Sequence, residues 1–431
     1  MEYGMAFYAS IAIFVITYGL IVWDKYPRML VSMGGAVIMI GFGFVSQETA
    51  IKQDIDFNTL GLLVGMMLIV GITSKSGLFQ AGALWAAHVT KGSPWRLLFL
   101  LSVITAVGSA LFDCVTAVLL IAPVTLTLAD KLKVNAFPFL MTEILVSNIG
   151  GTGLLVGNPP NVMIGSATGL TFNDFFIYLA PICALVTLVT IPILIFLYRG
   201  DLEPHPETRE AIMNISYKDA VEDPILLKKS IFVLALTIIC FILHHWLGME
   251  TATIAMGGAI LLMVIADIKP REVLHLVEWT TIFFFMGLFV VVGGLKASGV
   301  MTFLAEKVIS VTGGSLESTV FWVLWLSAIA SAFIDNIPFV ATMIPMLQEM
   351  GQMTGMPMDA VWWALALGAC YGGNGTMIGA TPNLVVANIG SLHGLRFTFV
   401  EYLKLGFPLM ILSIILAHIY LRSEEHTSEL Q

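Results

Sequence analysis

The sequence predicts an all-α polytopic membrane protein of two inverted-topology repeats, each with five membrane crossings, one re-entrant hairpin and one broken helix. Three observations predict it: composition, long apolar runs and an internal repeat. Of 431 residues, 58% are hydrophobic and 11% are charged, whereas soluble domains carry about 25% charged residues. The mean hydropathy is +0.92. These values exclude a soluble enzyme and a disordered protein, and a net charge of -9 lacks the basic footprint of a nucleic-acid binder.

Apolar runs long enough to cross a bilayer recur along the whole chain. A spanning helix needs about 20 apolar residues. The first run has no basic segment before it, so we expect a retained span rather than a cleaved signal. Crossings are predicted at 5–23, 29–46, 58–74, 136–164, 173–198, 229–246, 250–267, 278–295, 358–388 and 398–421, with interruptions in 136–164 and 358–388.

Two further apolar regions, 95–129 and 317–350, are split at their centres by polar residues and proline. Each half is expected to be too short to span alone, so each region is predicted to form a hairpin that enters and leaves on one side. With this layout, all basic residues except Lys52, Lys296, Lys307 and Arg422 fall on one face. That face is predicted to be cytoplasmic. Both termini are then outside, in the inner or plasma membrane of a bacterial or archaeal cell.

A single constant shift superposes the two halves without a gap from about residue 56 to 161, placing Gly65 on Gly287, Asp113 on Asp335 and Pro123 on Pro345. Five crossings per copy is an odd number, so the second copy is inverted, as in secondary transporters. The polar ending RSEEHTSELQ is predicted to be non-native. The predicted organisation is repeat 1 (1–199), a cytoplasmic linker (200–228), repeat 2 (229–421) and this tail (422–431).

The two hairpins place an aspartate at each tip, Asp113 and Asp335, near the middle of the membrane. A carboxylate at that depth is costly without water, a cation or a partner. Thr116, Asn336 and free carbonyls are candidates to complete an oxygen-rich cation site. The competing interpretation is that each aspartate only caps the following half-helix.

The broken helices carry the strings SNIGGTGLLVGNPPN and CYGGNGTMIGATPN. Glycine permits unusual backbone angles, and proline favours the first turn of a restarted helix. The predicted polar lining is Asn148, Thr152, Asn158, Asn161, Asn374, Thr376, Thr381 and Asn383. The predicted backbone breaks are at Gly150, Gly151, Gly153, Gly157, Pro160, Gly372, Gly373, Gly375, Gly379 and Pro382.

Glu143 stands alone in the apolar run before the first break, and its repeat counterpart is Leu365. An ionisable residue in a span is a functional hypothesis by default, so Glu143 is a candidate proton carrier. A structural hydrogen bond is the equal alternative. Cys114 and Cys370 are interpreted mainly as small buried hydrophobes, with metalloid ligation as the minor alternative. No resident metal or cofactor is expected.

These motifs resemble the ArsB/NhaD family of the ion transporter superfamily, which includes arsenite permeases, NhaD-type sodium/proton antiporters and the P protein. Citrate and dicarboxylate transporters are more distantly similar. The resemblance covers nearly the whole chain, from ITYGLIVWDKYPR to EYLKLGFPLM. It implies an alternating-access carrier with two re-entrant hairpins, often dimeric, with Asp113, Glu143, Asp335 and Asn336 at positions kept polar. Many relatives read GDPPN at the first break, whereas Asn158 here removes that charge.

The predicted function is proton-linked, alternating-access export of a cation or a metalloid, Na⁺ or arsenite, with H⁺ or Na⁺ as coupling ion. Carboxylates at the tips and no basic residue in the presumed site favour it. The alternative is a sodium-coupled citrate or dicarboxylate transporter, and the other class is a non-transporting scaffold or a channel. The expected partners are a small ion or anion, the lipid bilayer and a second copy in a homodimer.

Overall fold

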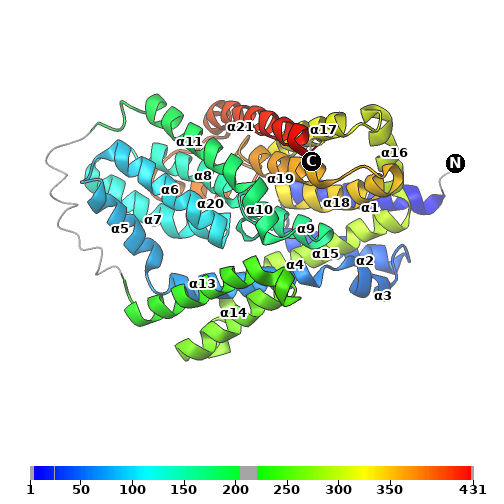
Figure 1. Ribbon diagram of the computed structural model, residues 1–431, viewed down its shortest axis with the longest axis horizontal. Coiled ribbons are helices and arrows are strands. Elements are labelled where there is room, and N and C mark those ends of the chain that lie inside the picture. Colours follow the sequence, from blue (N-terminus) through cyan, green and yellow to red (C-terminus); the bar gives the residue numbers. More distant parts are fainter. Residues whose placement is uncertain (1–3, 24, 204–220, 429–431) are drawn as a thin grey trace.

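The computed structural model describes residues 4–23, 25–203 and 221–428, and these residues contain helices and no strand. The helices run mainly along the long axis of the molecule (Figure 1). Part of the predicted linker, residues 204–220, lies outside the described residues. The first copy contains α1 (Met5–Trp23), α2 (Arg28–Gly41), α3 (Gln47–Thr49), η1 (Ala50–Asp54), α4 (Phe57–Ser74), α5 (Leu78–Val89), α6 (Pro94–Phe112), α7 (Cys114–Leu132), α8 (Phe137–Thr152), η2 (Leu155–Gly157), α9 (Pro159–Thr168), α10 (Phe172–Tyr178) and α11 (Ala180–Leu197).

The second copy repeats this order. Its helices are α13 (Pro224–Leu247), α14 (Thr251–Ala266), η3 (Pro270–Glu272), η4 (Leu274–Leu276), α15 (Trp279–Ala297), α16 (Val300–Thr312), α17 (Leu316–Phe333), α18 (Asn336–Thr354), α19 (Asp359–Gly372), α20 (Thr381–Leu392) and α21 (Phe399–Ser428). The shift that places Asp113 on Asp335 carries α7 onto α18 with both ends coinciding, and α4 onto α15 with the ends nearly coinciding. The inversion of the copies across the membrane stays a prediction.

Helices of the first copy pack directly on helices of the second copy. α2 packs on α15 of the second copy, and α4 packs on α14. Both crossings depend on a glycine: a Cβ on Gly65 would collide with the backbone at Ala255, and a Cβ on Gly287 would collide with the backbone at Ser32. Small residues let helix backbones approach closely where hydrophobic burial cannot drive association. The halves are therefore joined through their helix pairs as well as through the linker.

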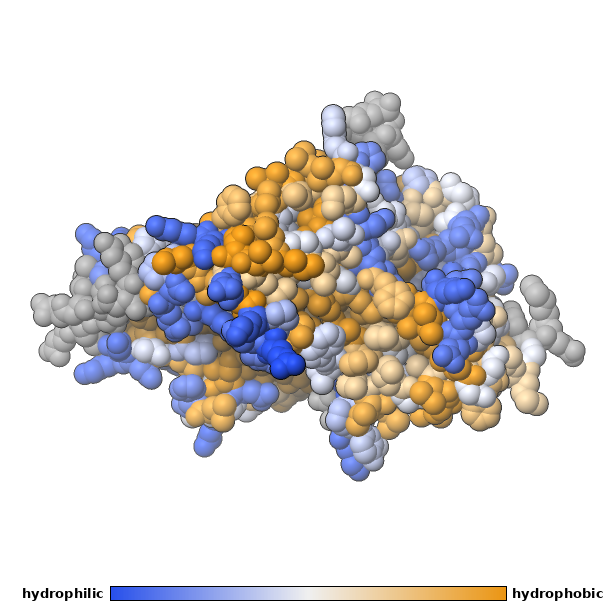
Figure 2. Space-filling view, turned by 90° about the horizontal axis from the view of Figure 1, so that it is seen from below, coloured by the Kyte–Doolittle hydropathy of each residue, from blue (hydrophilic) through white to orange (hydrophobic). Residues whose placement is uncertain are grey.

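Nine helices among the described residues are long and apolar enough to cross a membrane, or ten if Thr251–Ala266 and the bent segment Pro270–Leu276 form one span. Figure 2 shows hydrophilic residues in a group that runs from the left side to near the middle and in a second group at the right, with broad hydrophobic surface around them. Trp246, Val264 and Phe232 are among the large exposed apolar side chains. This surface agrees with a polytopic membrane protein.

Several predicted bounds were wrong. The hairpin halves were expected to be too short to span, but α6, α7 and α17 are each long and apolar enough to cross a membrane. Conversely, the predicted span 29–46 is a helix of only 14 residues, α2. α13 starts at Pro224, ahead of the predicted residue 229. The cause is the Asp223 carboxylate, which caps the helix by accepting from the Ile225 and Leu226 N–H groups.

Candidate functional site

The Asp113 carboxylate lies between α6 and α7, at the tip of the first hairpin. Its Oδ2 accepts hydrogen bonds from the Val115 and Thr116 N–H groups, each at 3.1 Å. The backbone at Asp113 has a φ of 134°, which a residue with a side chain adopts only under strain of about 1–3 kcal/mol. Capping therefore occurs, as the competing interpretation expected, and the carboxylate is held in a strained turn.

Asp335 occupies the equivalent tip between α17 and α18, but its surroundings differ. Its Oδ1 accepts from the Ile337 N–H at 3.1 Å, and its Oδ2 lies 2.6 Å from Nη1 of Arg28. The Asp335 side chain is 5% exposed and the Arg28 side chain is 28% exposed, so this is a partly buried, charge-assisted pair. The expectation of a site without a basic residue was therefore wrong: Arg28, at the first turn of α2, reaches this tip.

A cavity of about 300 Å³ lies beside Asp113 and is lined by residues of both copies. We call it the Asp113 cavity. Its polar lining residues are Asp113, Thr116, Glu278, Thr281 and Thr381, and the rest of its lining is mostly apolar. Thr381 Oγ1 also lies 3.4 Å from Asp335 Oδ2, so the second tip adjoins this cavity. The structure thus brings Asp113, Thr116, Asp335 and Thr381 together.

The two broken helices are held by equivalent hydrogen bonds. Ser109 Oγ donates to the Ser147 carbonyl at 2.6 Å, and Ser331 Oγ donates to the Ala369 carbonyl at 2.6 Å, at the equivalent positions of the second copy. Their side-chain amides act alike: Asn161 Nδ2 donates to the Thr152 and Leu154 carbonyls. These bonds satisfy carbonyls that the helix interruption leaves unpaired.

Asn383 repeats that role by donating to the Gly373 and Thr376 carbonyls. Two threonines of the same segments also bond the backbone: Thr152 Oγ1 donates to the Asn148 carbonyl, and Thr376 Oγ1 donates to the Ala332 carbonyl. Both breaks are therefore stabilised by hydrogen bonds from their own side chains, one of which reaches the neighbouring helix α17.

The breaks also contact each other. Asn148 Nδ2 donates to Asn374 Oδ1 at 2.8 Å and to Asn383 Oδ1 at 2.9 Å, and Asn374 Nδ2 donates to the Leu145 carbonyl. Asn148, Asn374 and Asn383 are buried, and none of them lines the Asp113 cavity. These asparagines join the two copies at the centre of the molecule.

Asn158 and Asn336 are both buried, and the Asn158 Nδ2 atom has no hydrogen-bond partner in the part of the chain that the structure describes. Neither residue lines the Asp113 cavity. Both follow a helix interruption, at the start of α9 and α18 respectively. Their assignment as ligands therefore stays a prediction.

Some predicted break glycines lie inside helices. α8 continues through Gly150 and Gly151 to Thr152, and α19 includes Gly372. A Cβ on Gly150 would collide with the Ala106 backbone, and one on Gly372 with Ala328. These glycines therefore permit close packing rather than interrupt the helix. Gly153, Gly373, Gly375 and Gly379 lie between the helices, and Gly157 ends the short helix η2 within the first break. Pro160 and Pro382 lie in first turns as predicted.

Glu143 lies apart from the Asp113 cavity, on α8. Its Oε1 accepts from Thr125 Oγ1 of α7 at 2.6 Å, and its buried Oε2 has no hydrogen-bond partner among the described residues. The structure therefore contains the structural hydrogen bond that was one interpretation. The unpartnered oxygen is compatible with the other interpretation, a proton carrier.

Sequence reasoning missed Arg28, Glu278 and Thr281. Arg28 entered only the count of basic residues, and its contact with Asp335 spans 307 residues, which no local motif signals. Glu278 was detectable, because the shift that superposes the two halves pairs it with Asp56. Acids at equivalent positions just before α4 and α15 were a signal of the same kind as the two tip aspartates.

Known proteins resemble the chain over nearly its whole length. It is 41% identical to a 46 kDa membrane protein of Mycobacterium leprae, over 96% of this chain and 97% of that protein. An uncharacterized transporter of Mycobacterium tuberculosis is also 41% identical, with the same coverage. The P protein of Homo sapiens is 33% identical over 95% of this chain but 59% of its own length.

The crystal structure of the YdaH transporter of Alcanivorax borkumensis aligns with a TM-score of 0.59 at 15% identity, covering 94% of this chain and 97% of that chain. At this identity the likeness shows the fold alone. The family model for citrate transporters, CitMHS, matches residues 18–368. The expected kinship with the ion transporter superfamily is thereby confirmed. The chain belongs to the citrate transporter family, a family of transporters and not of enzymes.

Proposed function

We propose that the protein is a secondary active transporter that exports a cation or a metalloid, Na⁺ or arsenite, in exchange for protons. The observation that carries the proposal is the lining of the Asp113 cavity. It contains the carboxyl groups of Asp113 and Glu278 and no basic side chain. A low-dielectric cavity of this composition attracts a cation and repels an anion, and it does not repel a neutral substrate such as uncharged arsenite. The hydroxyl groups of Thr116, Thr281 and Thr381 add oxygen ligands.

Arg28 gives the second tip a different role. Its guanidinium occupies the side of Asp335 that a cation would otherwise approach. The geometry therefore supports one cation position, at Asp113, with Asp335 neutralised by the protein itself. We propose H⁺ or Na⁺ as the coupling ion, with no further cofactor.

The proposed setting is a bacterial or archaeal inner membrane, with both termini outside and the chain assembled as a homodimer. The excess of basic residues on one face supports this orientation. Alternating access between the faces is supported by the repeated halves and their broken helices.

Sodium-coupled transport of a citrate- or dicarboxylate-type anion is the second candidate. Two observations favour it: Arg28 is a basic residue close to the Asp113 cavity, and the matching family is described as citrate transporter. A carboxylate substrate would bind Arg28 only after Asp335 released it. Asp113 and Glu278 would repel such a substrate unless a cation or proton were bound with it.

Flux in proteoliposomes distinguishes these candidates. Na⁺, Li⁺, arsenite and citrate should be compared under an imposed pH gradient, with wild type, Asp113→Asn and Asp335→Asn. We expect Asp113→Asn to lower cation or arsenite flux by at least about tenfold, equivalent to about 1.4 kcal/mol. Asparagine still caps a helix, so the fold should persist.

The exposed control Asp267→Asn should keep wild-type flux, because Asp267 lies at the end of α14 in a left-handed conformation that asparagine also adopts. Citrate uptake without cation or arsenite flux would reject the first candidate. Unchanged flux in both tip variants would remove the tip carboxylates from the mechanism.

A further inference from the structure

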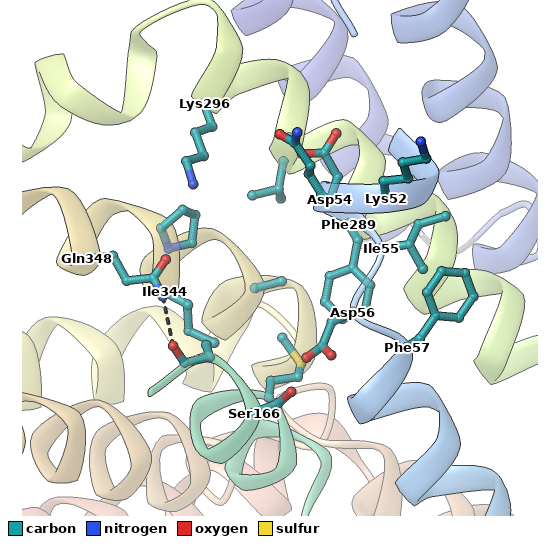
Figure 3. A pocket seen from close by; sticks show the side chains of 17 residues that line it. Lys52, Asp54, Ile55, Asp56, Phe57, Ser166, Phe289, Lys296, Ile344 and Gln348 are labelled. Carbon is teal, nitrogen blue, oxygen red and sulfur yellow. Dashed lines mark hydrogen bonds between the residues drawn. The ribbon is translucent and has the colours of Figure 1, made fainter. Parts of the chain in front are cut away.

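A second cavity, of about 490 Å³, lies away from Asp113. We call it the Asp54 cavity. It is bounded by the segment from Lys52 to Phe57, the end of α9, the end of α15 and the middle of α18. Figure 3 shows Lys296 and Asp54 in its upper part, with the Lys296 nitrogen pointing into the cavity. None of the candidate residues predicted from the sequence lines it.

The two cavities meet the same helices at different levels. The Asp54 cavity meets α4 at its first residue, Phe57, and α15 from Phe289 to Lys296, whereas the Asp113 cavity meets α4 from Leu62 to Gly71 and the start of α15 at Thr281. α9 and α18 likewise contribute to both. A helix of 18 residues is about 27 Å long. The two cavities therefore approach the centre of the molecule from opposite faces.

Asp54 is seated against α15 in a way that only glycine permits. A Cβ on Gly293 would collide with all three atoms of the Asp54 carboxyl group. The Asp54 Oδ2 atom is buried and has no hydrogen-bond partner among the described residues. A buried carboxylate oxygen without a donor is unfavourable when charged, so this seat favours a carboxyl group that can bind a proton.

The charged groups around Asp54 are mostly engaged elsewhere. Lys52, on the same segment, pairs with Glu48 at 2.7 Å. Asp56 caps α4 by accepting from the Asn58 and Thr59 N–H groups. α9 and α18 contribute the uncharged Ser166 and Gln348. Lys296 of α15 is therefore the cation that acts on Asp54, and no ion pair joins the two in the described structure.

The repeat shows that the fold does not require this pair. When the two halves are superposed, Leu276 is the counterpart of Asp54 and Ser74 is the counterpart of Lys296. Leu276 packs on Gly71 as Asp54 packs on Gly293. An apolar side chain therefore serves the equivalent packing role, and the carboxyl group of Asp54 is additional to it.

We propose that Asp54 is a proton-binding site of the carrier, loaded through the Asp54 cavity on the face opposite the Asp113 cavity. In the predicted orientation this is the outer face, from which a proton would enter during cation export. Burial raises the pKa of Asp54 to about 6, and the Lys296 ammonium opposes that rise. The inference rests on the proton linkage in the proposed function and names where the proton binds.

The test is the dependence of flux on the pH at the face of the Asp54 cavity, in oriented proteoliposomes of the full chain. Asp54→Asn should remove the component that titrates near pH 6. Lys296→Gln should move its midpoint to higher pH, because loss of the ammonium disfavours the charged carboxylate. Glu306→Gln, an exposed acid of α16 outside the cavity, should keep the wild-type profile.

Infrared difference spectroscopy of the purified protein gives a readout that does not need transport. A protonated-carboxyl band that appears as the pH falls through 6 should be absent from Asp54→Asn and shifted in Lys296→Gln. Persistence of the band and of the pH profile in Asp54→Asn would overturn the inference. A wild-type protein without proton-linked flux, but with the band assigned to Asp54, would instead reject the proposed function.

Discussion

Asp113 and Asp335 occupy equivalent positions in the two copies, and both cap the helix that follows. Their remaining surroundings differ: Asp335 pairs with Arg28, whereas Asp113 lines a cavity shared with Glu278. A buried carboxylate with an arginine is already neutralised, whereas one without a cation remains available to a cation from solution. In the proposed mechanism, this difference between the copies leaves Asp113 as the tip that would bind the ion.

Replacement of Arg28 should make the Asp335 carboxylate available to a cation from solution. Arg28→Gln leaves a buried carboxylate without its cation. Loss of one partner from a fully buried pair costs about 3–5 kcal/mol, and the cost here should be smaller because the Arg28 side chain is 28% exposed. We expect a lower midpoint of thermal unfolding in choline buffer and partial recovery in Na⁺, measured on the purified protein.

Arg28→Gln combined with Asp335→Asn should lose the Na⁺ dependence, since the Asp335 carboxylate is removed together with the guanidinium that neutralises it. If Arg28→Gln alone were as stable as wild type in choline buffer, the ion pair would not determine ion binding at this tip.

Glu143 has a separate test at the residue scale. In Glu143→Gln, the amide oxygen still accepts the hydrogen bond from Thr125, so thermal stability should change by less than about 1 kcal/mol. Proton-linked flux should nevertheless fall, because glutamine cannot carry a proton. Full flux with unchanged pH dependence would leave only the structural hydrogen bond.

At the scale of helices, the sequence was most informative where chemistry is local. Pro160 and Pro382 lie in the first turns of restarted helices, and Asp113 and Asp335 lie at the two hairpin tips, because proline and capping residues act on their own backbone. The Arg28 contact with Asp335 could not be found this way, since it depends on tertiary packing. The asparagines were identified as a polar group, but their mutual hydrogen bonds depend on how the two copies meet.

The close helix crossings predict that alanine substitutions at two helical glycines change stability in opposite directions. Gly287→Ala should lower stability by about 1–3 kcal/mol, because the new methyl group collides with the α2 backbone. Gly34→Ala, on α2 with nothing within 4 Å, should raise it by about 0.5–1 kcal/mol through helix propensity. Thermal unfolding in detergent measures both. Equal effects of the two substitutions would argue against the packing of α2 on α15.

For the whole molecule, the two cavities meet α15 toward opposite ends and α4 at successive levels, which implies access from two faces. Labelling with a membrane-impermeant thiol reagent tests the faces directly, in a Cys240→Ser background. In intact cells Lys52→Cys should react and Lys75→Cys should not, and the pattern should reverse in inverted vesicles. Labelling of both from one side would refute the predicted orientation.

The packing of α2 on α15 and of α4 on α14 also has a consequence for biogenesis. α2 is a helix of only 14 residues, and its partner begins at Trp279. At a synthesis rate of about 5–20 residues per second, the ribosome needs roughly 10–50 s to make the intervening chain. During this interval α2 lacks the surface that covers it, so the nascent first half is the stage at which insertion factors or membrane proteases can act.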